Sequence, residues 1–499
     1  MEISSNNKIQ VKFDWINNVY GRIVTLDANL LRDIVNKFSV YVQNYYFMPS
    51  YKKGFWDGKI KFVKPNGIFY LGNFKRIYDY IKDCNYEIIV HEKIKNFLEE
   101  NENQLSNLTE EFLKYTDDLL KDSVMPYKHQ LRGALKSLYY KRGICEHVTS
   151  SGKSLTITLV VNYLLKKYEE MKILVLVPKL DLVEQLYENM VSFGLDKKYI
   201  GKYCGYKKDE DEPIIISTWQ SICRKKELLL KFKALIVDEC HSLKADVVRS
   251  TTEKMLNAEY RLGFTGTLPE HKADFFLVEG VLGHVLDKVG YQELQEAKQI
   301  SDININILKI YYPNKILEKL NNCDYQEEKI FLENDEFRSK AILKIASEYI
   351  KRDKNVLILV KKIEHSENLF NLFKNNFEKV HLINGNIDIQ QRTFIRHNLE
   401  NSGGNIIIAT VGVFSVGISI KRLHVIIFAA AGKSKIQTLQ SVGRGLRLHS
   451  SKNILQLYDI VENLKFSEEH FRKRLKYYKD NNFNIKIKDI YLKEEIYGY

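Results

Sequence analysis

A short segment, Ser150–Ser154, carries residue types that can bind phosphate groups. It follows the apolar run Ile144–Val148 and precedes an apolar run of helical length, so we expect a strand, a tight turn and a helix. Backbone N–H groups at a helix start and the helix dipole both favour an anion. In such a turn Lys153 would contact nucleotide phosphates, and Ser154 would bind Mg²⁺. His147 replaces the first glycine of the usual motif, so an ordinary surface turn is an equal alternative for the segment alone.

A second candidate is the acidic pair Asp238 and Glu239, which ends the apolar run Ala234–Val237. Sheets of α/β proteins bind ligands at the carboxyl ends of their strands. There Asp238 would hold a Mg²⁺ ion that bridges nucleotide phosphates, and Glu239 would orient the attacking water. A helix N-cap is the simpler interpretation of such a pair. The phosphate-binding segment upstream favours the nucleotide site instead.

A third candidate is a pair of arginines, Arg444 and Arg447, within Gln440–Arg447. Residues three apart neighbour each other on a helix, so we expect both guanidinium groups on one helix face. Guanidinium groups near a γ-phosphate stabilise the charge that develops during hydrolysis. A basic helix face that contacts nucleic acid is the alternative interpretation.

The elements that would position these residues alternate between short apolar runs and helical segments from residue 127 onward, which predicts doubly wound parallel sheets. Two such series occur, so we predict an α/β fold with two tandem lobes, at 123–297 and 298–463. A basic helix and an extended tail follow at 464–499. The runs that we expect to form strands are Lys172–Pro178, Ile214–Thr218, Ala234–Glu239, Arg261–Thr267, Asn304–Tyr311, Val356–Val360, Val380–Ile383, Ile406–Thr410, Val425–Phe428 and Ile454–Asp459.

The first part of the chain, residues 1–90, predicts a small α+β domain, and the polar, acid-rich segment 91–122 predicts a helical connector. Asp27 is expected to cap a helix that runs through Phe38. The turn formers Pro65-Asn66-Gly67 predict a hairpin between strands at 59–63 and 68–71.

Residues 41–64 of this domain interleave aromatic side chains with lysines. Lysines can neutralise phosphates while aromatic faces stack on unpaired bases, so this segment predicts a nucleic-acid contact. Some of the aromatic residues, Tyr41 and Phe47 above all, have a simpler interpretation as the core of the small domain. The residues that we expect to contact nucleic acid here are Lys52, Lys53, Trp56 and Lys59.

The composition is that of a globular protein, with 499 residues, 44% hydrophobic and 28% charged, and its length predicts roughly two to four domains. The formal charge of +13 favours a polyanion, nucleic acid before membrane, although a general lysine bias would give the same excess. The six cysteines form no C-x-x-C pair, which argues for a reducing compartment without disulfides or structural metal. We expect neither a secretory signal nor a membrane span.

In their order and spacing, Gly152-Lys153-Ser154, Asp238–His241 and Gln440–Arg447 resemble motifs I, II and VI of superfamily-two helicases. The resemblance covers about 125–460. It implies two RecA-like lobes, ATP and Mg²⁺ as cofactors, and ATP hydrolysis coupled to unwinding. Thr265-Gly266-Thr267 resembles motif III, which couples hydrolysis to lobe movement. The further residues implied for the nucleotide are Tyr127, Gln130, Ser150, Ser151 and Gly417, and those implied for nucleic acid are Thr218, Gln220 and Thr410.

Gly54–Ile60, Thr218-Trp219-Gln220 and Val413–Ser419 further resemble the UvsW-like recombination helicases of T-even phages, which extends the resemblance over nearly the whole chain. Such enzymes migrate DNA junctions, regress stalled forks and unwind R-loops. This implies branched or single-stranded DNA or RNA–DNA hybrids as substrates, single-strand-binding or recombination proteins as partners, and the host cytoplasm as location. Ser419 departs from the pattern, because an aspartate often follows Gly-Ile in motif V.

Three other interpretations remain open at this stage. The motor motifs also fit an RNA helicase, and they fit the motor subunit of a restriction or defence complex. A non-catalytic DNA-binding scaffold is the third. The intact set Lys153, Asp238, Glu239, Arg444 and Arg447 argues against that scaffold.

Overall fold

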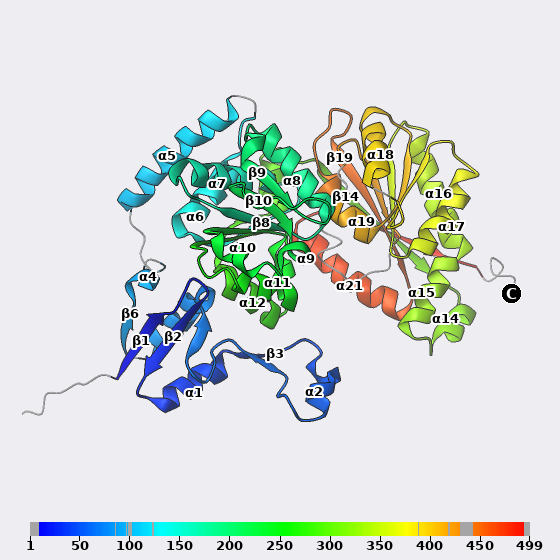
Figure 1. The fold of residues 1–499 in the computed structure, drawn as a ribbon. Helices are drawn as coiled ribbons and strands as arrows, with labels where there is room; N and C mark the ends of the chain where they lie inside the picture. Colours follow the sequence, from blue (N-terminus) through cyan, green and yellow to red (C-terminus); the bar gives the residue numbers. More distant parts are fainter. Residues whose placement is uncertain are drawn as a thin grey trace, which may run out of the picture. The chain divides into compact units, whose positions relative to one another are not determined.

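The computed structural model describes residues 9–84, 86–95, 97, 102–121, 124–387, 389–417, 420–429 and 443–493 (Figure 1). The chain forms two compact units. The first contains residues 1–147 and 152–288, and the second contains 148–151 and 289–499. No helix among the described residues is long and apolar enough to cross a membrane.

A seven-stranded sheet in the order β13-β7-β12-β11-β8-β10-β9 forms the centre of the first lobe. The pairs from β7 to β9 in that order are parallel, which confirms the predicted α/β fold. Strands such as β8 and β10 are buried throughout because helices cover both faces. The strands are β7 (Arg142–His147), β8 (Ile173–Val177), β9 (Ile200–Tyr203), β10 (Ile214–Thr218), β11 (Ala234–Asp238), β12 (Tyr260–Thr265) and β13 (Val285–Val289). The helices are α6 (Lys128–Tyr140), α7 (Lys153–Lys167), α8 (Leu180–Ser192), α9 (Trp219–Ile222), α10 (Lys226–Lys231), α11 (Asp246–Glu253) and α12 (Lys272–Leu282).

The N-terminal domain is built on a four-stranded mixed sheet in the order β5-β2-β1-β6. Asp27 caps α1 as predicted, because its carboxylate accepts the backbone N–H groups of Asn29 and Leu30. The strands are β1 (Gln10–Trp15), β2 (Tyr20–Thr25), β3 (Ser39–Tyr41), β4 (Lys59–Lys61), β5 (Ile68–Tyr70) and β6 (Glu87–Val90). The helices are α1 (Ala28–Lys37), α2 (Pro49–Lys52), α3 (Phe74–Lys82) and α4 (Glu92–Lys95).

The predicted hairpin is confirmed next to its turn, where Val63 pairs antiparallel with Phe69 and Lys64 N donates to Ile68 O at 2.8 Å, but it extends no further. Gly67 has φ +79° and donates its N–H to Lys64 O at 2.8 Å. The flanking strands nevertheless join different sheets, since β4 pairs with β3 and β5 pairs with β2. The turn packs directly on β2: Ile23 N donates to Gly67 O at 2.9 Å, and a Cβ on Gly67 would lie 2.2 Å from Ile23 O. This contact directs β5 into the four-stranded sheet.

The N-terminal domain packs on α12 of the first lobe. Phe276 of α12 belongs to the same hydrophobic cluster as the domain's core and meets Phe62 edge to face, with ring centroids 5.3 Å apart. Arg76 forms an ion pair with the buried Glu279. A Cβ on Gly72 would lie 1.9 Å from Glu279 O, so the two backbones touch. The domain is therefore a fixed part of the first unit.

Helix α5 (Glu102–Leu120) lies in the segment predicted to be a connector, and it packs on α7. The Glu111 carboxylate accepts from Tyr163 and from Lys167, each at 2.8 Å. Asn162 donates to Tyr115 O, also at 2.8 Å. This segment therefore contributes a helix to the surface of the lobe.

The second unit contains another seven-stranded sheet, in the order β16-β17-β15-β18-β19-β14-β20, and its pairs are parallel. The predicted tail contains β20 (Asn484–Tyr491), which pairs with β14 at the sheet edge. The other strands are β14 (Asp302–Tyr311), β15 (Val356–Val360), β16 (Val380–Ile383), β17 (Ile406–Thr410), β18 (Val425–Phe428) and β19 (Ile454–Glu462). The helices are α13 (Tyr291–Glu296), α14 (Asn314–Leu320), α15 (Tyr325–Asn334), α16 (Glu336–Ile350), α17 (Ile363–Lys374), α18 (Ile389–Asn401), α19 (Val411–Gly417) and α21 (Lys465–Asp480).

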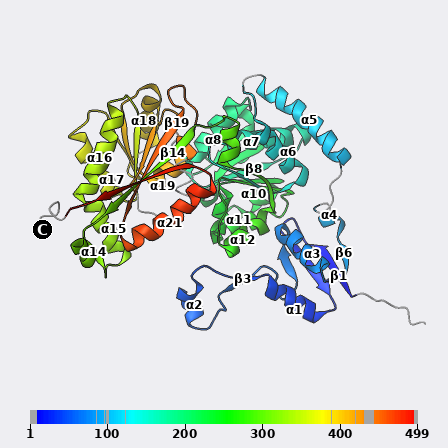
Figure 2. The ribbon, with the colours of Figure 1, turned by 180° about the vertical axis from the view of Figure 1, so that it is seen from behind.

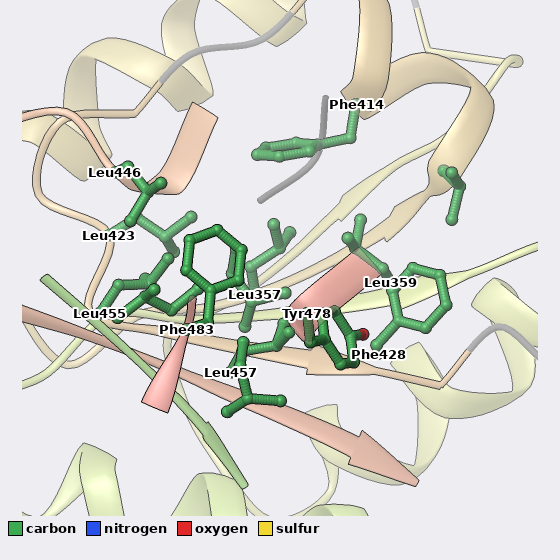
Figure 3. Packing of buried hydrophobic residues seen from close by; sticks show 14 of the residues in the cluster. Leu357, Leu359, Phe414, Leu423, Phe428, Leu446, Leu455, Leu457, Tyr478 and Phe483 are labelled. Atoms are coloured by element: carbon green, nitrogen blue, oxygen red, sulfur yellow. The ribbon is translucent and has the colours of Figure 1, made fainter. Parts of the chain in front are cut away.

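Helix α21 packs on this sheet (Figure 2). Arg474 of α21 donates to both carboxylate oxygens of Asp459 at 2.9 Å, and Tyr478 donates to the same carboxylate. The ring of Tyr478 packs among leucines of β15 and β19 (Figure 3). The predicted basic helix is therefore part of the core of the second lobe.

Candidate nucleotide site and nucleic-acid interface

The candidate catalytic segments of the first lobe meet at one edge of its sheet. The phosphate-binding segment follows β7, Thr265 ends β12, and Asp238 ends β11. These three strands are adjacent, with β12 between the other two. Because they run parallel, their carboxyl ends lie at the same edge, which is where α/β sheets bind ligands.

The phosphate-binding segment forms a tight turn that leads into α7. Ser150 and Gly152 both lie in the left-handed region, with φ of +74° and +82°. The positive φ favours glycine at position 152, and a Cβ there would also displace the Gln130 amide, whose Nε2 would lie 2.1 Å away. The Lys153 ammonium folds back and donates to His147 O at 3.1 Å. The first N–H groups of α7 have no intrahelical acceptor, so this turn has the donors that a phosphate requires.

His147, which replaces the expected glycine, is fully buried and connects the turn to neighbouring elements. Its Nε2 lies 2.9 Å from Asp287 Oδ2 on β13. Arg132 and Lys136 of α6 donate to Asp287 Oδ1 at 2.7 and 3.1 Å. Gly133 allows the close packing, since a Cβ there would lie 2.7 Å from the His147 ring. Asp287 therefore ties α6 to the end of β7.

The ionisation of this cluster follows from its burial. Burial acts to raise the pKa of Asp287, but the hydrogen bonds from His147, Arg132 and Lys136 outweigh it and hold that pKa well below its usual range. Burial also lowers the pKa of His147, and Asp287 opposes this effect only in part. An ionised carboxylate only accepts hydrogen bonds, so His147 is neutral near pH 7 and donates from Nε2.

Gln130 links the start of α6 to the phosphate-binding turn. Its Oε1 accepts the Tyr127 N–H at 2.8 Å, and its Nε2 lies 3.5 Å from Gly152 O. Tyr127 is half exposed and stacks on His129, with ring centroids 5.8 Å apart. Both residues resemble the adenine-reading element of superfamily-two helicases; Tyr127 has an exposed ring, and Gln130 contacts the turn.

Glu239 and its neighbours connect the acidic pair to Thr265. Glu239 has φ +51°, a strained value for a non-glycine residue that is common at functional sites. Its Oε2 lies 3.3 Å from the Thr265 hydroxyl, which also lies 3.0 Å from His241 Nδ1. A shift of the Glu239 carboxylate would therefore change the contacts of the Thr265 hydroxyl and could move the Thr265–Thr267 segment.

The oxygen donors at this edge suit a magnesium–nucleotide complex. Asp238 supplies a carboxylate and Ser154 a hydroxyl, and both are hard ligands of the kind Mg²⁺ prefers. Among the described residues, no group of three or more His, Cys, Asp or Glu could form an all-protein metal cage. Mg²⁺ is commonly bound through one or two carboxylates together with substrate phosphates, so the donor set fits that mode.

Arg444 and Arg447 lie in the second unit. Arg444 is buried within the helical residues 443–445, whereas Arg447 follows in a bend and is partly exposed. The prediction that both lie on one helix face is therefore wrong, because the helix ends before Arg447. Gln440 to Val442, and Ile418 and Ser419 of motif V, lie outside the described residues.

Comparisons with known proteins decide the family. Three family models match the chain: the N-terminal domain of DNA helicase UvsW over 8–91, the res subunit of type III restriction enzymes over 103–270, and the helicase conserved C-terminal domain over 339–449. The ATP-dependent DNA helicase uvsW of Enterobacteria phage T4 is 30% identical over 492 residues, which cover 94% of this chain and 97% of that protein. The chain belongs to the UvsW family. It is therefore an ATP-dependent DNA helicase that binds ATP and nucleic acid.

Solved structures extend the comparison to the fold. The crystal structure of T4 UvsW is 27% identical and covers 97% of this chain and 99% of that one, with a TM-score of 0.49. S. cerevisiae Dbp5 bound to RNA and ADP BeF3 is 15% identical and covers 78% of this chain and 95% of that one, with a TM-score of 0.54. The Dbp5 similarity concerns the fold alone. The predicted superfamily-two resemblance is confirmed by the UvsW relative and the family models.

Two of the residues expected to contact nucleic acid lie at the ends of β-strands. Thr218 ends β10 and Thr410 ends β17, and both are largely buried. Gln220 of α9 is exposed. A groove with a volume of ≈ 420 Å³ lies between the ends of β8 and β10, and its lining includes Pro178, Thr218 and Gln220. The first lobe thus offers an open path at the edge that also carries the nucleotide site.

The aromatic and lysine residues of the N-terminal domain form an exposed loop around α2. The interpretation that Tyr41 and Phe47 belong to the core is wrong, since both are exposed. Phe55 is 83% exposed, whereas Trp56 is partly buried and donates its indole N–H to Lys59 O at 2.9 Å. Trp56 is one of the predicted nucleic-acid contacts, and Phe55 is not. Nothing in the sequence separated these adjacent rings, because the direction of each side chain depends on the loop fold.

Sequence reasoning also missed Asp287, Arg132 and Lys136. The only signal for Asp287 was an acid within the apolar strand β13, and no partner for it was visible from spacing. Its partners come from a helix far away in the chain.

Proposed function

We propose that this helicase acts on branched DNA: it regresses forks, migrates junctions and unwinds R-loops. The observation that carries the proposal is the exposed aromatic and lysine loop on a domain fixed to the first lobe. The domain organisation of the chain supports it, since the match to the N-terminal domain of DNA helicase UvsW precedes the two motor matches. A second nucleic-acid surface fixed to one lobe would let the enzyme hold one DNA arm while the lobes act on another.

The loop has the chemistry that unpaired nucleic acid requires. Lys52 lies over the ring of Phe47 and Lys59 over that of Tyr41, with the ammonium groups 6.0 and 4.6 Å from the ring centroids. Lysines of this kind neutralise phosphates, and an exposed ring such as that of Phe55 can stack on a base. Lys53 is also exposed on this loop. These contacts carry no sequence information, so recognition should depend on DNA structure.

The fixed attachment would transmit force between the loop and the motor. Tyr70 donates to Glu253 of α11 at 2.6 Å, and Arg76 pairs with Glu279 of α12. Burial raises the pKa of Glu279, which Arg76 partly offsets. Glu279 is buried while Arg76 is partly exposed, so removing Arg76 would leave a buried carboxyl without its partner; this contact favours movement of the domain together with the first lobe.

For hydrolysis, we assign each residue of the nucleotide site one role. Lys153 would contact the β- and γ-phosphates, and Ser150, Ser151 and Gly152 would present backbone N–H groups. Asp238 and Ser154 would hold Mg²⁺, which supplies charge neutralisation at the phosphates when bound. Glu239 would orient water. The residues assigned to the second lobe are Arg444 and Arg447 for transition-state charge and Gly417 for the nucleotide.

The proposal is tested with DNA-stimulated ATP hydrolysis and unwinding on a fork, a four-way junction, an R-loop and a plain overhang duplex. We expect activity on the three branched substrates to exceed that on the overhang. Phe55→Ala should weaken fork binding by about tenfold, since one base stack contributes roughly 1–3 kcal/mol. ATPase activity with single-stranded DNA should not change.

Two variants act as comparisons for Phe55→Ala. Leu26→Ala removes another fully exposed apolar side chain of the same domain and should leave fork activity unchanged. Trp56→Ala should also weaken fork activity, through the shape of the loop. Equal losses on forks and single strands, or equal activity on all four substrates, would contradict a role in branch recognition.

A further inference from the structure

A second polar cavity lies in the first unit, at the sheet edge opposite to the nucleotide site. Its volume is ≈ 470 Å³, within the range of small-molecule sites. Arg142 begins β7, Lys233 immediately precedes β11, and Glu259 immediately precedes β12. These strands are adjacent, so the cavity lies under their amino ends. Residues of the N-terminal domain, among them Trp15 and Asn18, form its other wall.

The charge of this cavity is strongly positive. Its described lining contains the cations Lys93, Lys141, Arg142 and Lys233 against the single acid Glu259. Lys93 and Lys233 are exposed, so a ligand can reach both, and the Lys93 ammonium lies over the ring of Trp15, 4.1 Å from its centroid. Cations gathered around one concave site attract anions, and this effect is strongest where the walls have a low dielectric constant.

Arg142 gives the cavity its most specific feature. The residue is 5% exposed, and its Nη2 donates to Asn18 O. Its Nε and Nη1 are buried and have no hydrogen-bond partner among the described residues. No carboxylate within that part of the chain forms an ion pair with it. Burial lowers the pKa of Arg142, and the nearby Arg261 lowers it further. A buried guanidinium with two unused donors is costly unless an anion pairs with it.

The remaining lining residues fit a planar ring better than a bare anion. Trp15, Tyr139 and Tyr140 contribute aromatic side chains, and Asn18, Gln104 and Asn257 contribute polar groups. Aromatic faces stack on bases, and side-chain amides donate to and accept from base edges. The cavity therefore combines phosphate-binding and base-binding chemistry in one place.

We infer that this cavity binds a nucleoside phosphate, with the phosphate against Arg142 and the base among the aromatic side chains. The inference does not depend on branched-DNA activity. Two sources share this chemistry: a free nucleotide and the 5′-phosphorylated end of a DNA strand. Either ligand would contact both the N-terminal domain and the first lobe and would stabilise their attachment.

The first test measures binding of thymidine 5′-monophosphate to the full chain by equilibrium dialysis. A pyrimidine is used because the catalytic site is expected to read adenine. We expect one bound equivalent, with affinity at least tenfold lower in the double variant Lys93→Ala, Lys233→Ala. Lys226→Ala removes an exposed lysine outside the cavity and should bind like wild type. Equal affinity in all three proteins would overturn the inference.

The second test separates the two sources and the two parts of the ligand. Oligothymidylates of equal length with a 5′-phosphate or a 5′-hydroxyl are compared in the same proteins. If wild type prefers the 5′-phosphorylated oligothymidylate and the double lysine variant does not, the ligand is a DNA strand end. If wild type shows no such preference but still binds thymidine monophosphate, the ligand is a free nucleotide. Inorganic phosphate that competes as well as the nucleotide would overturn the assignment of the base.

The third test addresses an internal counter-ion. Glu99 and Glu100 follow closely after Phe97, whose ring lies over Arg142. If these carboxylates neutralise Arg142, the double variant Glu99→Gln, Glu100→Gln should bind the nucleotide at least tenfold more tightly than wild type. That result would overturn the inference, because Arg142 would then already have a counter-ion in the native chain. Unchanged affinity supports it. Because Arg142 is buried, Arg142→Met is used only if its circular dichroism matches wild type.

Discussion

Strand β7 begins and ends with a buried basic side chain, and the two ends differ in the partner that this side chain meets. His147, at the carboxyl end, meets the Asp287 carboxylate at 2.9 Å. Arg142, at the amino end, meets a backbone carbonyl and has two donors without a partner among the described residues. The carboxyl end has a carboxylate partner within the chain, although His147 Nδ1 is also buried without a partner among the described residues, whereas the amino end has the properties of a ligand site.

The difference explains how a departure from a family motif can be tolerated. The missing glycine before Gly152 is replaced by a histidine that fastens the phosphate-binding turn to β13 and α6. The buried charge of this cluster is the Asp287 carboxylate, and it has two cations and the His147 ring as partners. Around Arg142 no such set occurs within the described lining, and the cations there exceed the acids.

The largest expected effect distinguishes the two sheet edges by activity. Lys153→Ala should lower kcat for ATP roughly 10³-fold, about 4 kcal/mol of transition-state stabilisation, because a positioned charge near the phosphates is lost. DNA binding should persist. Lys233→Ala, at the opposite edge, should leave kcat within about twofold. Steady-state ATPase assays check both, and a large loss in Lys233→Ala would mean that the two edges are not functionally separate.

The next effect concerns the stability of the His147 end. Asp287→Ala should lower the free energy of unfolding by about 3 kcal/mol, because it leaves His147, Arg132 and Lys136 without their shared acceptor. It should also raise KM for ATP more than it lowers kcat, since α6 and the turn would separate. Glu188→Ala removes an exposed acid of α8 and should change stability by less than about 0.5 kcal/mol. Urea unfolding distinguishes them, and similar values for both would show that the Asp287 cluster contributes little.

His424 is a buried histidine whose hydrogen-bond partners among the described residues include no carboxylate, so its effect on stability should depend on pH in a way that can be compared with His147. Burial, with nearby Lys354 and Lys452, lowers the pKa of His424 from 6.5 to about 4. Its folded pKa is below its unfolded value, so its contribution to stability is complete above pH 6.5 and is lost as pH falls toward 4. We expect the stability difference between wild type and His424→Gln to fall by about 3 kcal/mol from pH 7 to pH 4. Urea unfolding followed by circular dichroism measures this, and a difference independent of pH would contradict the assignment.

The smallest effect concerns the cations around Arg142. Lys93 lies over the ring of Trp15, with its ammonium group 4.1 Å from the ring centroid. Such a contact contributes about 0.5–1 kcal/mol at exposed sites, so Lys93→Ala should change the free energy of unfolding by less than about 1 kcal/mol. Thermal and urea unfolding without nucleotide check this. A loss of several kcal/mol would mean that Lys93 is required for folding and not for a ligand.

The sequence predicted the motor better than it predicted the small domain. The apolar runs of both lobes match their strands because fully buried parallel strands require continuous apolar sequence. In the N-terminal domain, the turn at Gly67 and the antiparallel pair beside it were predictable, but the sheets that the flanking strands join were not, because Gly67 packs on Ile23 of another strand. The predicted helix face for Arg444 and Arg447 failed because the local helix ends between them.

The sequence by itself determined which residue types follow each strand of the first lobe, and hence that Lys153, Asp238 and Thr265 meet at one edge. This holds because parallel strands place their carboxyl ends at the same edge of the sheet, whatever the conformation of the connecting loops. Only the tertiary structure decided which buried charges are compensated. Asp287 reaches His147 across two neighbouring strands, and Arg142 faces a wall supplied by a separate domain. Such contacts depend on side chains distant in the chain, and no local pattern encodes them.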